Sequence, residues 1–162
     1  MTTLVHMGDA MNSSSSGLVS GHYHLFSARH PANAVGVHPD DMHSGTVSKP
    51  VKVLGSEVPP SIWEVVVKAN GKVRLYIKHL QLRSVYDKYI YASHPKIGQP
   101  EPGQEWTIEP TSTGRCRIRS TQNWTKDSVW FVLDIDPVAL QEATEPVPLS
   151  QEWMFEPIQS RS

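Results

Sequence analysis

The sequence predicts an all-β fold made of three equivalent units, and two repeated phrases carry this prediction. A tryptophan recurs at Trp63, Trp106 and Trp153, with spacings of 43 and 47 residues. The second and third copies stand in the same phrase, Gln-Glu-Trp. A fixed period of this size is typical of an architecture built from repeated structural units.

A glycine-led phrase repeats in step with the tryptophans. It begins at Gly21, Gly71 and Gly114, and apolar and polar residues alternate after each glycine. Alternation at period two predicts a strand with one buried face, which carries Tyr23 and Leu25 in the first copy. Each unit therefore opens with a half-buried strand and closes with a strand that bears a tryptophan.

The segments between these phrases also read as short strands separated by turn residues. The predicted strands are 22–28, 33–37, 50–54 and 61–68 in the first unit, 72–78, 82–86, 88–92 and 104–109 in the second, and 115–120, 128–135, 146–149 and 152–156 in the third. Twelve short strands in three four-strand units predict a β-trefoil, a six-stranded barrel closed by three hairpins. In that fold the three repeated tryptophan side chains fill the barrel interior.

Turn residues support these boundaries. Asn70-Gly71 lies between two apolar alternating runs and predicts a two-residue hairpin, because both residue types tolerate positive φ. Pairs of prolines precede each tryptophan strand, where proline is confined to turns and strand starts. Only residues 138–145 have the composition of a helix, and the segment is short.

The chain of 162 residues is long enough for one domain, which we expect to span residues 21–158. Residues 1–20, with a serine run at 13–16, are predicted to be disordered. Cys116 is the single cysteine, so no intrachain disulfide can form, as fits a reducing compartment. No export signal is recognised and the longest apolar run is too short to span a bilayer, so the sequence predicts no membrane partner.

The sequence contains no enzyme signature. A nucleophile elbow, a phosphate-binding glycine loop and a His-Glu-x-x-His pattern are all missing from it. Histidines are frequent, but His22, His24, His38 and His43 form only a loose group, whereas zinc needs three or four ligands. We therefore expect a protein that is not an enzyme and that needs no cofactor or metal.

Basic residues alternate on two equivalent strands, and these rows are expected to point to solvent. They are Lys72, Arg74 and Lys78 in the second unit, and Arg115, Arg117 and Arg119 in the third. Such rows could contact a phosphate backbone. Aromatic residues do not interleave with them as they do in single-strand binders, so we expect no nucleic-acid partner.

Residues 18–158 resemble the fungal β-trefoil serine protease inhibitors of mushrooms. The phrases that carry the resemblance are the glycine-led first strand with Tyr23, Val35-Gly36-Val37-His38-Pro39, Val51-Lys52-Val53-Leu54, Pro59-Pro60-Ser61-Ile62-Trp63-Glu64-Val65, Glu105-Trp106-Thr107-Ile108 and Glu152-Trp153. The resemblance implies a cytosolic protein without disulfides or enzymatic activity. It also implies that loops block the active sites of trypsin-like or chymotrypsin-like serine proteases.

In this family the reactive loop lies between the second and third strands, which corresponds here to residues 40–49. The resemblance thus implies a protease-binding segment of Asp41, Met42, His43, Ser44 and Gly45, with the middle three at its tip. A trypsin pocket carries a buried acid and prefers Lys or Arg, which this tip lacks. Met42 instead suits an apolar pocket. Basic residues on other loops are secondary candidates, namely Lys96 and Lys126.

Two other functions stay open for the same scaffold. A lectin would combine an aspartate with an aromatic platform in each unit, and the nearest candidates are Asp40, Asp87 and Asp127 with Tyr89, Trp124 and Trp130. A cysteine protease inhibitor would insert an early, glycine-bearing loop into a papain-type cleft, for which Gly36 and Gly45 are candidates. The segment 40–49 would then be a connection without a role in serine protease binding.

Overall fold

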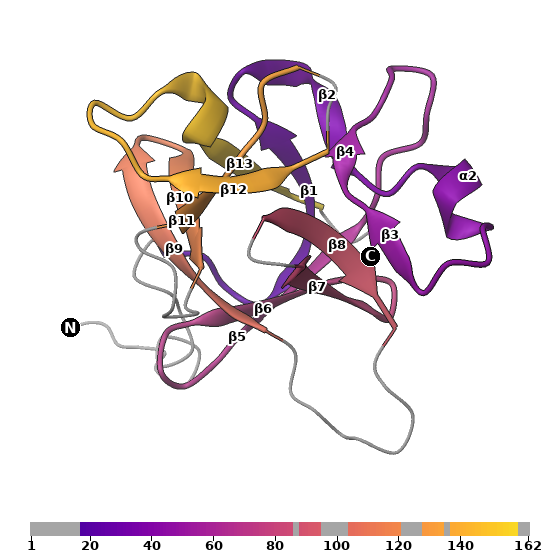
Figure 1. Ribbon diagram of the computed structural model, residues 1–162. Coiled ribbons are helices and arrows are strands. Elements are labelled where there is room, and N and C mark those ends of the chain that lie inside the picture. The colour runs from indigo at the N-terminus through magenta and orange to yellow at the C-terminus, as the bar shows by residue number, and fades with distance from the viewer. Residues whose placement is uncertain (1–16, 86–87, 95–103, 121–127, 135–136, 159–162) are drawn as a thin grey trace.

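The computed structural model describes residues 17–85, 88–94, 104–120, 128–134 and 137–158, and it is built almost wholly of strands (Figure 1). Most of the segment predicted to be disordered lies outside these residues, so that expectation stays a prediction. The strands are β1 Gly21–Ser27, β2 His30–Gly36, β3 Ser48–Pro50, β4 Lys52–Val53, β5 Trp63–Val67, β6 Val73–Ile77, β7 Leu80–Val85, β8 Tyr89–Ser93, β9 Glu105–Ser112, β10 Arg115–Ser120, β11 Ser128–Phe131, β12 Ala139–Glu142 and β13 Trp153–Pro157. Two short helical turns join them, α2 Pro39–Met42 and η1 Leu149–Gln151.

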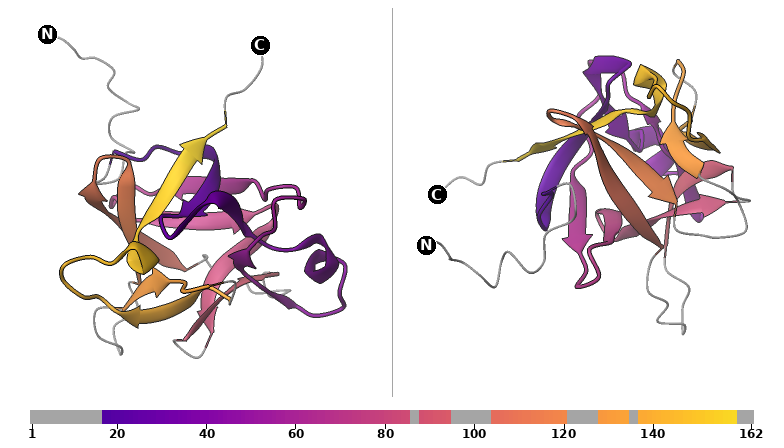
Figure 2. Two further views of the ribbon diagram at one scale, coloured as in Figure 1. Left: turned by 90° about the horizontal axis from the view of Figure 1, so that it is seen from above. Right: turned by 90° about the vertical axis from the view of Figure 1, so that its left-hand side faces the viewer.

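The first and last strands of each unit close into a barrel. Antiparallel pairing runs from β1 to β5, β6, β9, β10 and β13, and β13 pairs again with β1. The inner strands of the units form three antiparallel pairs: β2 with β4, β7 with β8, and β11 with β12. Figure 2 shows these pairs arranged around the barrel. A closed ring of six strands capped by three strand pairs is the β-trefoil arrangement.

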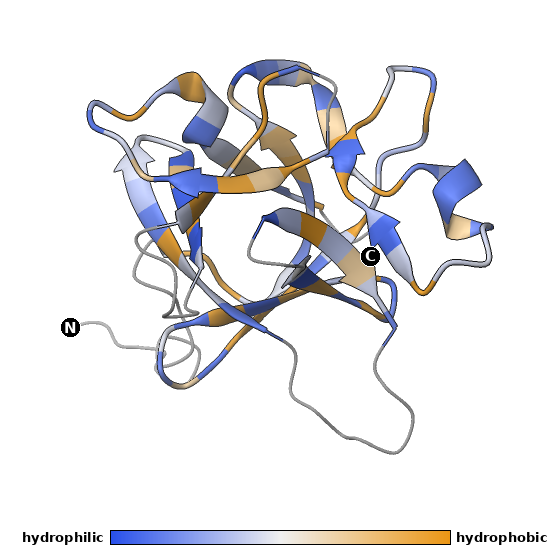
Figure 3. Ribbon diagram, viewed as in Figure 1, coloured by the Kyte–Doolittle hydropathy of each residue, from blue (hydrophilic) through white to orange (hydrophobic). Residues whose placement is uncertain are grey.

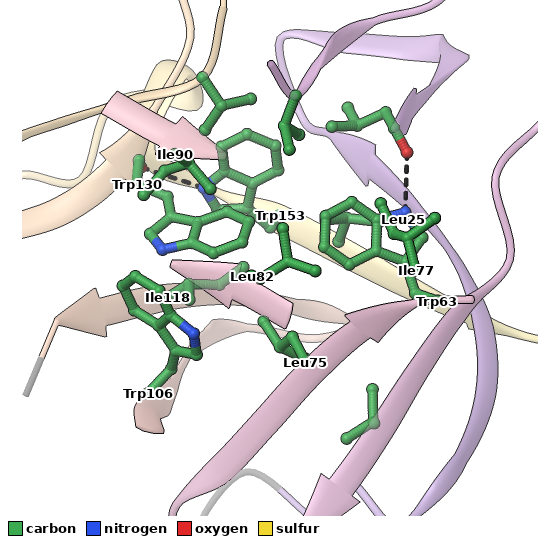
Figure 4. Packing of buried hydrophobic residues seen from close by; sticks show 14 of the residues in the cluster. Leu25, Trp63, Leu75, Ile77, Leu82, Ile90, Trp106, Ile118, Trp130 and Trp153 are labelled. Carbon is green, nitrogen blue, oxygen red and sulfur yellow. Dashed lines mark hydrogen bonds between the residues drawn. The ribbon is translucent and has the colours of Figure 1, made fainter. Parts of the chain in front are cut away.

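Four tryptophans fill the barrel, although the repeat predicted three. Trp63, Trp106 and Trp153 are fully buried as expected, and so is Trp130. The ring centroid of Trp130 lies 6.0 Å from that of Trp63, 5.1 Å from that of Trp106 and 6.0 Å from that of Trp153 (Figure 4). Apolar and polar residues alternate along the barrel strands, so one face of each points into this core (Figure 3).

Two indole hydrogen bonds explain why the sequence repeat did not predict Trp130 as a core residue. The Nε1 atom of Trp63 donates to the Val35 carbonyl at 2.8 Å, and Nε1 of Trp153 donates to the Trp130 carbonyl at 3.1 Å. Trp130 therefore occupies, in the third unit, the place that Val35 has in the first. A tryptophan at a strand position that elsewhere holds a small aliphatic residue leaves no periodic signal.

The Gln-Glu-Trp phrase has the same structural role in the second and third units. Its glutamate pairs with the arginine on the opening strand of its own unit: Glu105 with Arg74 at 3.4 Å, and Glu152 with Arg115 at 3.3 Å. Its glutamine ties the strand to the preceding chain: Gln104 accepts from the Ser84 N–H, and Gln151 accepts from the Thr144 N–H. The first unit has Ser61-Ile62 in place of Gln-Glu and lacks this acid.

The arginines of the basic rows pair with acids instead of forming the solvated faces that were predicted, whereas Lys78 is exposed as expected. Besides the two pairs above, Arg119 makes a bidentate contact with Glu109, at 2.7 and 3.0 Å. Arg117 lies between Glu109 and Glu145, at 3.5 and 2.8 Å, and is largely covered. These carboxylates neutralise the positive charge that a phosphate backbone would need.

Several predicted elements differ from the structure. The single strand 50–54 is divided into β3 and β4, which pair with different partners, so the described residues form thirteen strands. The predicted strand 146–149 is wrong: β12 lies earlier, within the segment considered for a helix. Within the described ranges, no helix has the length and apolarity needed to cross a membrane.

The turn at Asn70-Gly71 also differs in detail from its prediction. Only Gly71 has positive φ, at +85°, and the Lys68 N–H donates to the Lys72 carbonyl at 2.8 Å. The turn thus spans three residues, with glycine in the left-handed position. Asn70 contributes its side chain, which accepts from the Lys72 N–H at 3.0 Å.

Candidate functional site

The connection between β2 and β3 contains the predicted protease-binding residues. It stands out from the barrel at one edge of the molecule, where α2 and β3 lie side by side (Figure 1). α2 begins with Pro39, whose fixed φ suits the first helical position. His38 caps it by accepting from the Asp40 N–H at 3.1 Å, and two acids in the first turn stabilise the positive end of the helix dipole.

Met42 lies in this helical turn, which corrects the expectation that it stands at the tip of an extended loop. Its side chain is partly buried and packs against the hydrophobic core. A continuous run of exposed residues begins one residue later and covers residues 43–47, which we call the apical segment. Of the predicted site residues, His43, Ser44 and Gly45 lie in the apical segment, whereas Asp41 and Met42 lie at its base.

A buried lysine braces the apical segment from inside. Lys49 is 3% exposed, and its Nζ atom donates to the Ser44 carbonyl at 2.9 Å and to Ser44 Oγ at 3.2 Å. The Ser44 hydroxyl donates to the Asp41 carbonyl at 2.8 Å. The Thr46 hydroxyl is therefore the donor in its own 2.8 Å contact with Ser44 Oγ. The segment is thus held by side chains while its outer surface stays exposed.

Both ends of the connection are fixed to the strands. Asp41 forms an ion pair with Lys52 at 3.1 Å, and both side chains are partly covered. β3 pairs with β8, and the hydroxyls of Ser48 and Ser93 lie 2.9 Å apart. Neither Lys49 nor Lys52 is thereby free to enter a protease pocket.

Sequence reasoning missed the bracing role of Lys49, although the signal for it was present. Lys49, Val51 and Val53 alternate with Pro50 and Lys52, so period two places Lys49 on the side of the buried Val51. A lysine on the inner side of such a row must direct its ammonium to an acceptor. The Ser44 carbonyl is that acceptor.

A pocket of about 480 Å³ adjoins the base of the loop. Its walls are mostly apolar and include two charged residues, Glu64 and Lys78. The lining residues are His22, Val37, Pro39, Met42, His43, Pro59, Pro60, Ser61, Ile62, Glu64, Ile77 and Lys78. It lies where the first unit departs from the Gln-Glu-Trp phrase. The short Ser61 and the 53% exposed Ile62 stand there in place of glutamine and glutamate.

Gly36 is a packing residue, which weakens its candidacy for a papain-binding loop. A Cβ atom on Gly36 would lie 2.1 Å from Ser61 Oγ. Ser61 in turn accepts from the Val37 N–H at 3.0 Å. By contrast, a Cβ atom on Gly45 would meet open space.

The other candidate residues are only partly covered by the structure. Lys96, Asp87, Trp124, Asp127 and Lys126 lie outside the described residues. Asp40 and Tyr89 are exposed. Trp130 is fully buried, so it cannot serve as a sugar-stacking platform.

The described residues contain no group of three or more His, Cys, Asp or Glu side chains that could hold a metal ion. Cys116 is buried, and burial together with the charge of Glu152 raises the pKa of its thiol to about 12. A thiol with such a pKa is protonated at neutral pH and is a poor nucleophile.

The fold has relatives among solved structures. No protein-family model and no curated protein sequence matches the chain. A proteinase inhibitor from Coprinopsis cinerea is similar with a TM-score of 0.71 and 15% identity, over 87% of this chain and 99% of the inhibitor. The designed threefold-symmetric protein ThreeFoil is similar with a TM-score of 0.64 and 17% identity, over 85% of this chain and 99% of ThreeFoil.

A mosquitocidal holotoxin contains a similar part, with a TM-score of 0.63 and 18% identity. The likeness covers 88% of this chain but 18% of the toxin chain. Three proteins of such different kinds share the scaffold. The likeness at these identities therefore establishes that the chain is a β-trefoil protein, and the choice among functions depends on its loops.

Proposed function

We propose that this protein is a reversible inhibitor of serine endopeptidases and that the β2–β3 connection enters the protease active site. The observation that carries the proposal is the apical segment itself, residues 43–47. It is exposed on its outer side and held on its inner side by the buried Lys49. The similarity of the fold to that of a proteinase inhibitor adds support.

The energetics of binding favour a loop of this kind. A flexible segment loses conformational entropy when a protease immobilises it, at about 0.5–1.5 kcal/mol for each immobilised rotamer-rich side chain. In the apical segment, Ser44 and Thr46 are already held by hydrogen bonds before contact. The pairing of β3 with β8 and the ion pair between Asp41 and Lys52 fix the two ends of the connection. A preorganised loop can therefore bind tightly through an interface of ordinary size.

The preference for serine proteases over cysteine proteases comes from the sequence resemblance. The tight packing of Gly36 against Ser61 weakens its candidacy as a papain-binding residue, whereas Gly45 is exposed and has open space around it. The proposal also includes a cytoplasmic location and the absence of enzymatic activity, both implied by the resemblance. The lectin alternative loses support, because Trp130 is part of the core.

The test is titration of the folded protein against trypsin, chymotrypsin, elastase, subtilisin and papain. We expect inhibition of at least one serine protease, with loss of that inhibition when His43, Ser44, Thr46 and Val47 are all replaced by glycine. A control replaces Thr113, an exposed residue of the β9–β10 turn, by glycine. Inhibition of papain alone would favour the cysteine protease inhibitor, and a folded protein that inhibits no member would refute the proposal.

A further inference from the structure

We infer that Val47 is the residue that fills the specificity pocket of the target, and that the target is a serine protease with a small apolar pocket of the elastase type. This inference rests on the proposed function and names the class of protease that the loop recognises. Some side chains of the loop are exposed to a partner, and others are buried or paired.

The basic and long apolar side chains of the loop are buried or paired within the protein. Lys49 is buried beneath the apical segment, and Lys52 is engaged by Asp41. Met42 packs against the core from its helical turn. A pocket that requires Lys or Arg, or a deep slot that requires a long apolar side chain, finds no suitable residue here.

Val47 is the apolar side chain that the loop presents. It is 64% exposed, and the other residues of the apical segment are His43, Ser44, Gly45 and Thr46. Solvation of an aliphatic side chain to this degree is unfavourable, and burial against a partner removes that cost. Its three side-chain carbons match a shallow apolar pocket, which a Phe or Arg would overfill.

The backbone at Val47 is positioned for such contact. Thr46 precedes it with its hydroxyl bonded to Ser44, and Ser48 follows it as the first residue of β3. The carbonyl of Val47 accepts from the His94 N–H at 3.4 Å, a long and weak hydrogen bond. A protease could replace this bond by the two donors of its oxyanion hole, which are stronger when they meet developing negative charge.

The experiment compares Val47→Asp and Val47→Lys with the unchanged protein against elastase, chymotrypsin and trypsin. Val19→Lys is the matched control, since Val19 is also an exposed valine, at 49%, outside the loop. Because both valines are exposed, thermal unfolding is expected to be the same for all variants. We expect the unchanged protein to inhibit elastase at least tenfold more strongly than the other two proteases.

The substitutions at Val47 should change which protease is inhibited. Val47→Asp should weaken elastase inhibition by at least a hundredfold, because an unpaired carboxylate would enter an apolar pocket. Val47→Lys should create trypsin inhibition, and Val19→Lys should not. If a serine protease is inhibited equally by the unchanged protein and by Val47→Asp, the inference is refuted while the proposed function stands. If the unchanged protein inhibits no protease, the proposed function fails and this inference fails with it.

Discussion

Replacement of Lys49 by methionine should weaken protease inhibition while leaving the free energy of unfolding nearly unchanged. Lys49 is 3% exposed and donates to two atoms of Ser44, at 2.9 and 3.2 Å. Methionine has a similar length and can fill the same space, but it cannot donate. The substitution therefore removes the internal brace of the apical segment without a large cavity.

The expected magnitudes follow from these contacts. A hydrogen bond to a charged group contributes about 1.5–3 kcal/mol, so the braced conformation of the loop should lose stability of this order. At about 1.4 kcal/mol per factor of ten, inhibition should weaken by about 10- to 100-fold. The free energy of global unfolding should change by less than about 1 kcal/mol, because an apolar isostere also avoids the desolvation of a buried ammonium group.

Two measurements on the same variant check this reasoning. The inhibition constant against the protease found in the panel gives the functional loss, and urea unfolding followed by far-ultraviolet circular dichroism gives the stability. Lys72→Met, in the β5–β6 turn, is the matched control and should leave both quantities unchanged. Inhibition that survives Lys49→Met would refute the bracing role. A stability loss as large as the loss of binding would make Lys49 a structural residue only.

Three further predictions concern the core. Trp63→Phe should cost about 1–3 kcal/mol more than Trp130→Phe in chemical unfolding, because only the first removes an indole hydrogen bond from a buried carbonyl, and equal costs would contradict the assigned bonds. Gly36→Ala should destabilise by about 1–3 kcal/mol, with part of the loss recovered in the double variant with Ser61→Gly; additive effects would contradict the close contact. Cys116 should stay unmodified by a thiol reagent at pH 8. Since its pKa is raised from about 9 to about 12, the stability it contributes should be lost as pH rises through that window, and rapid labelling of the folded protein would refute its burial.

The sequence predicted the barrel because its strands obey a simple local rule. Alternation at period two after Gly21 and Gly71 placed the buried faces correctly, and the burial patterns of β1 and β6 confirm it. The repeated tryptophans also predicted the core, since each lies at or next to the start of the strand that closes its unit and is fully buried. These features can be recognised along the chain without knowing which distant residues touch.

The parts that were missed depend on contacts between distant residues. The arginine rows looked solvent-exposed because their glutamate partners are far away in sequence, as in the pair of Arg115 with Glu152. The short helix at Pro39–Met42 has a proline and two acids as its local signal, but its packing against the core decides where Met42 points. For that reason we infer that Val47, and not Met42, contacts a protease.

The four clustered indoles should also give the folded protein a distinctive circular dichroism spectrum. Ring separations of 5.1 to 6.0 Å are short enough for the electronic transitions of neighbouring chromophores to couple. The two edge-to-face pairs, at 90° and 87°, have skewed rather than parallel orientations, which favour a chiral exciton signal. We expect an intense dichroic couplet from the strong far-ultraviolet transitions of the indoles that disappears on unfolding, so that folding can be followed without an added label.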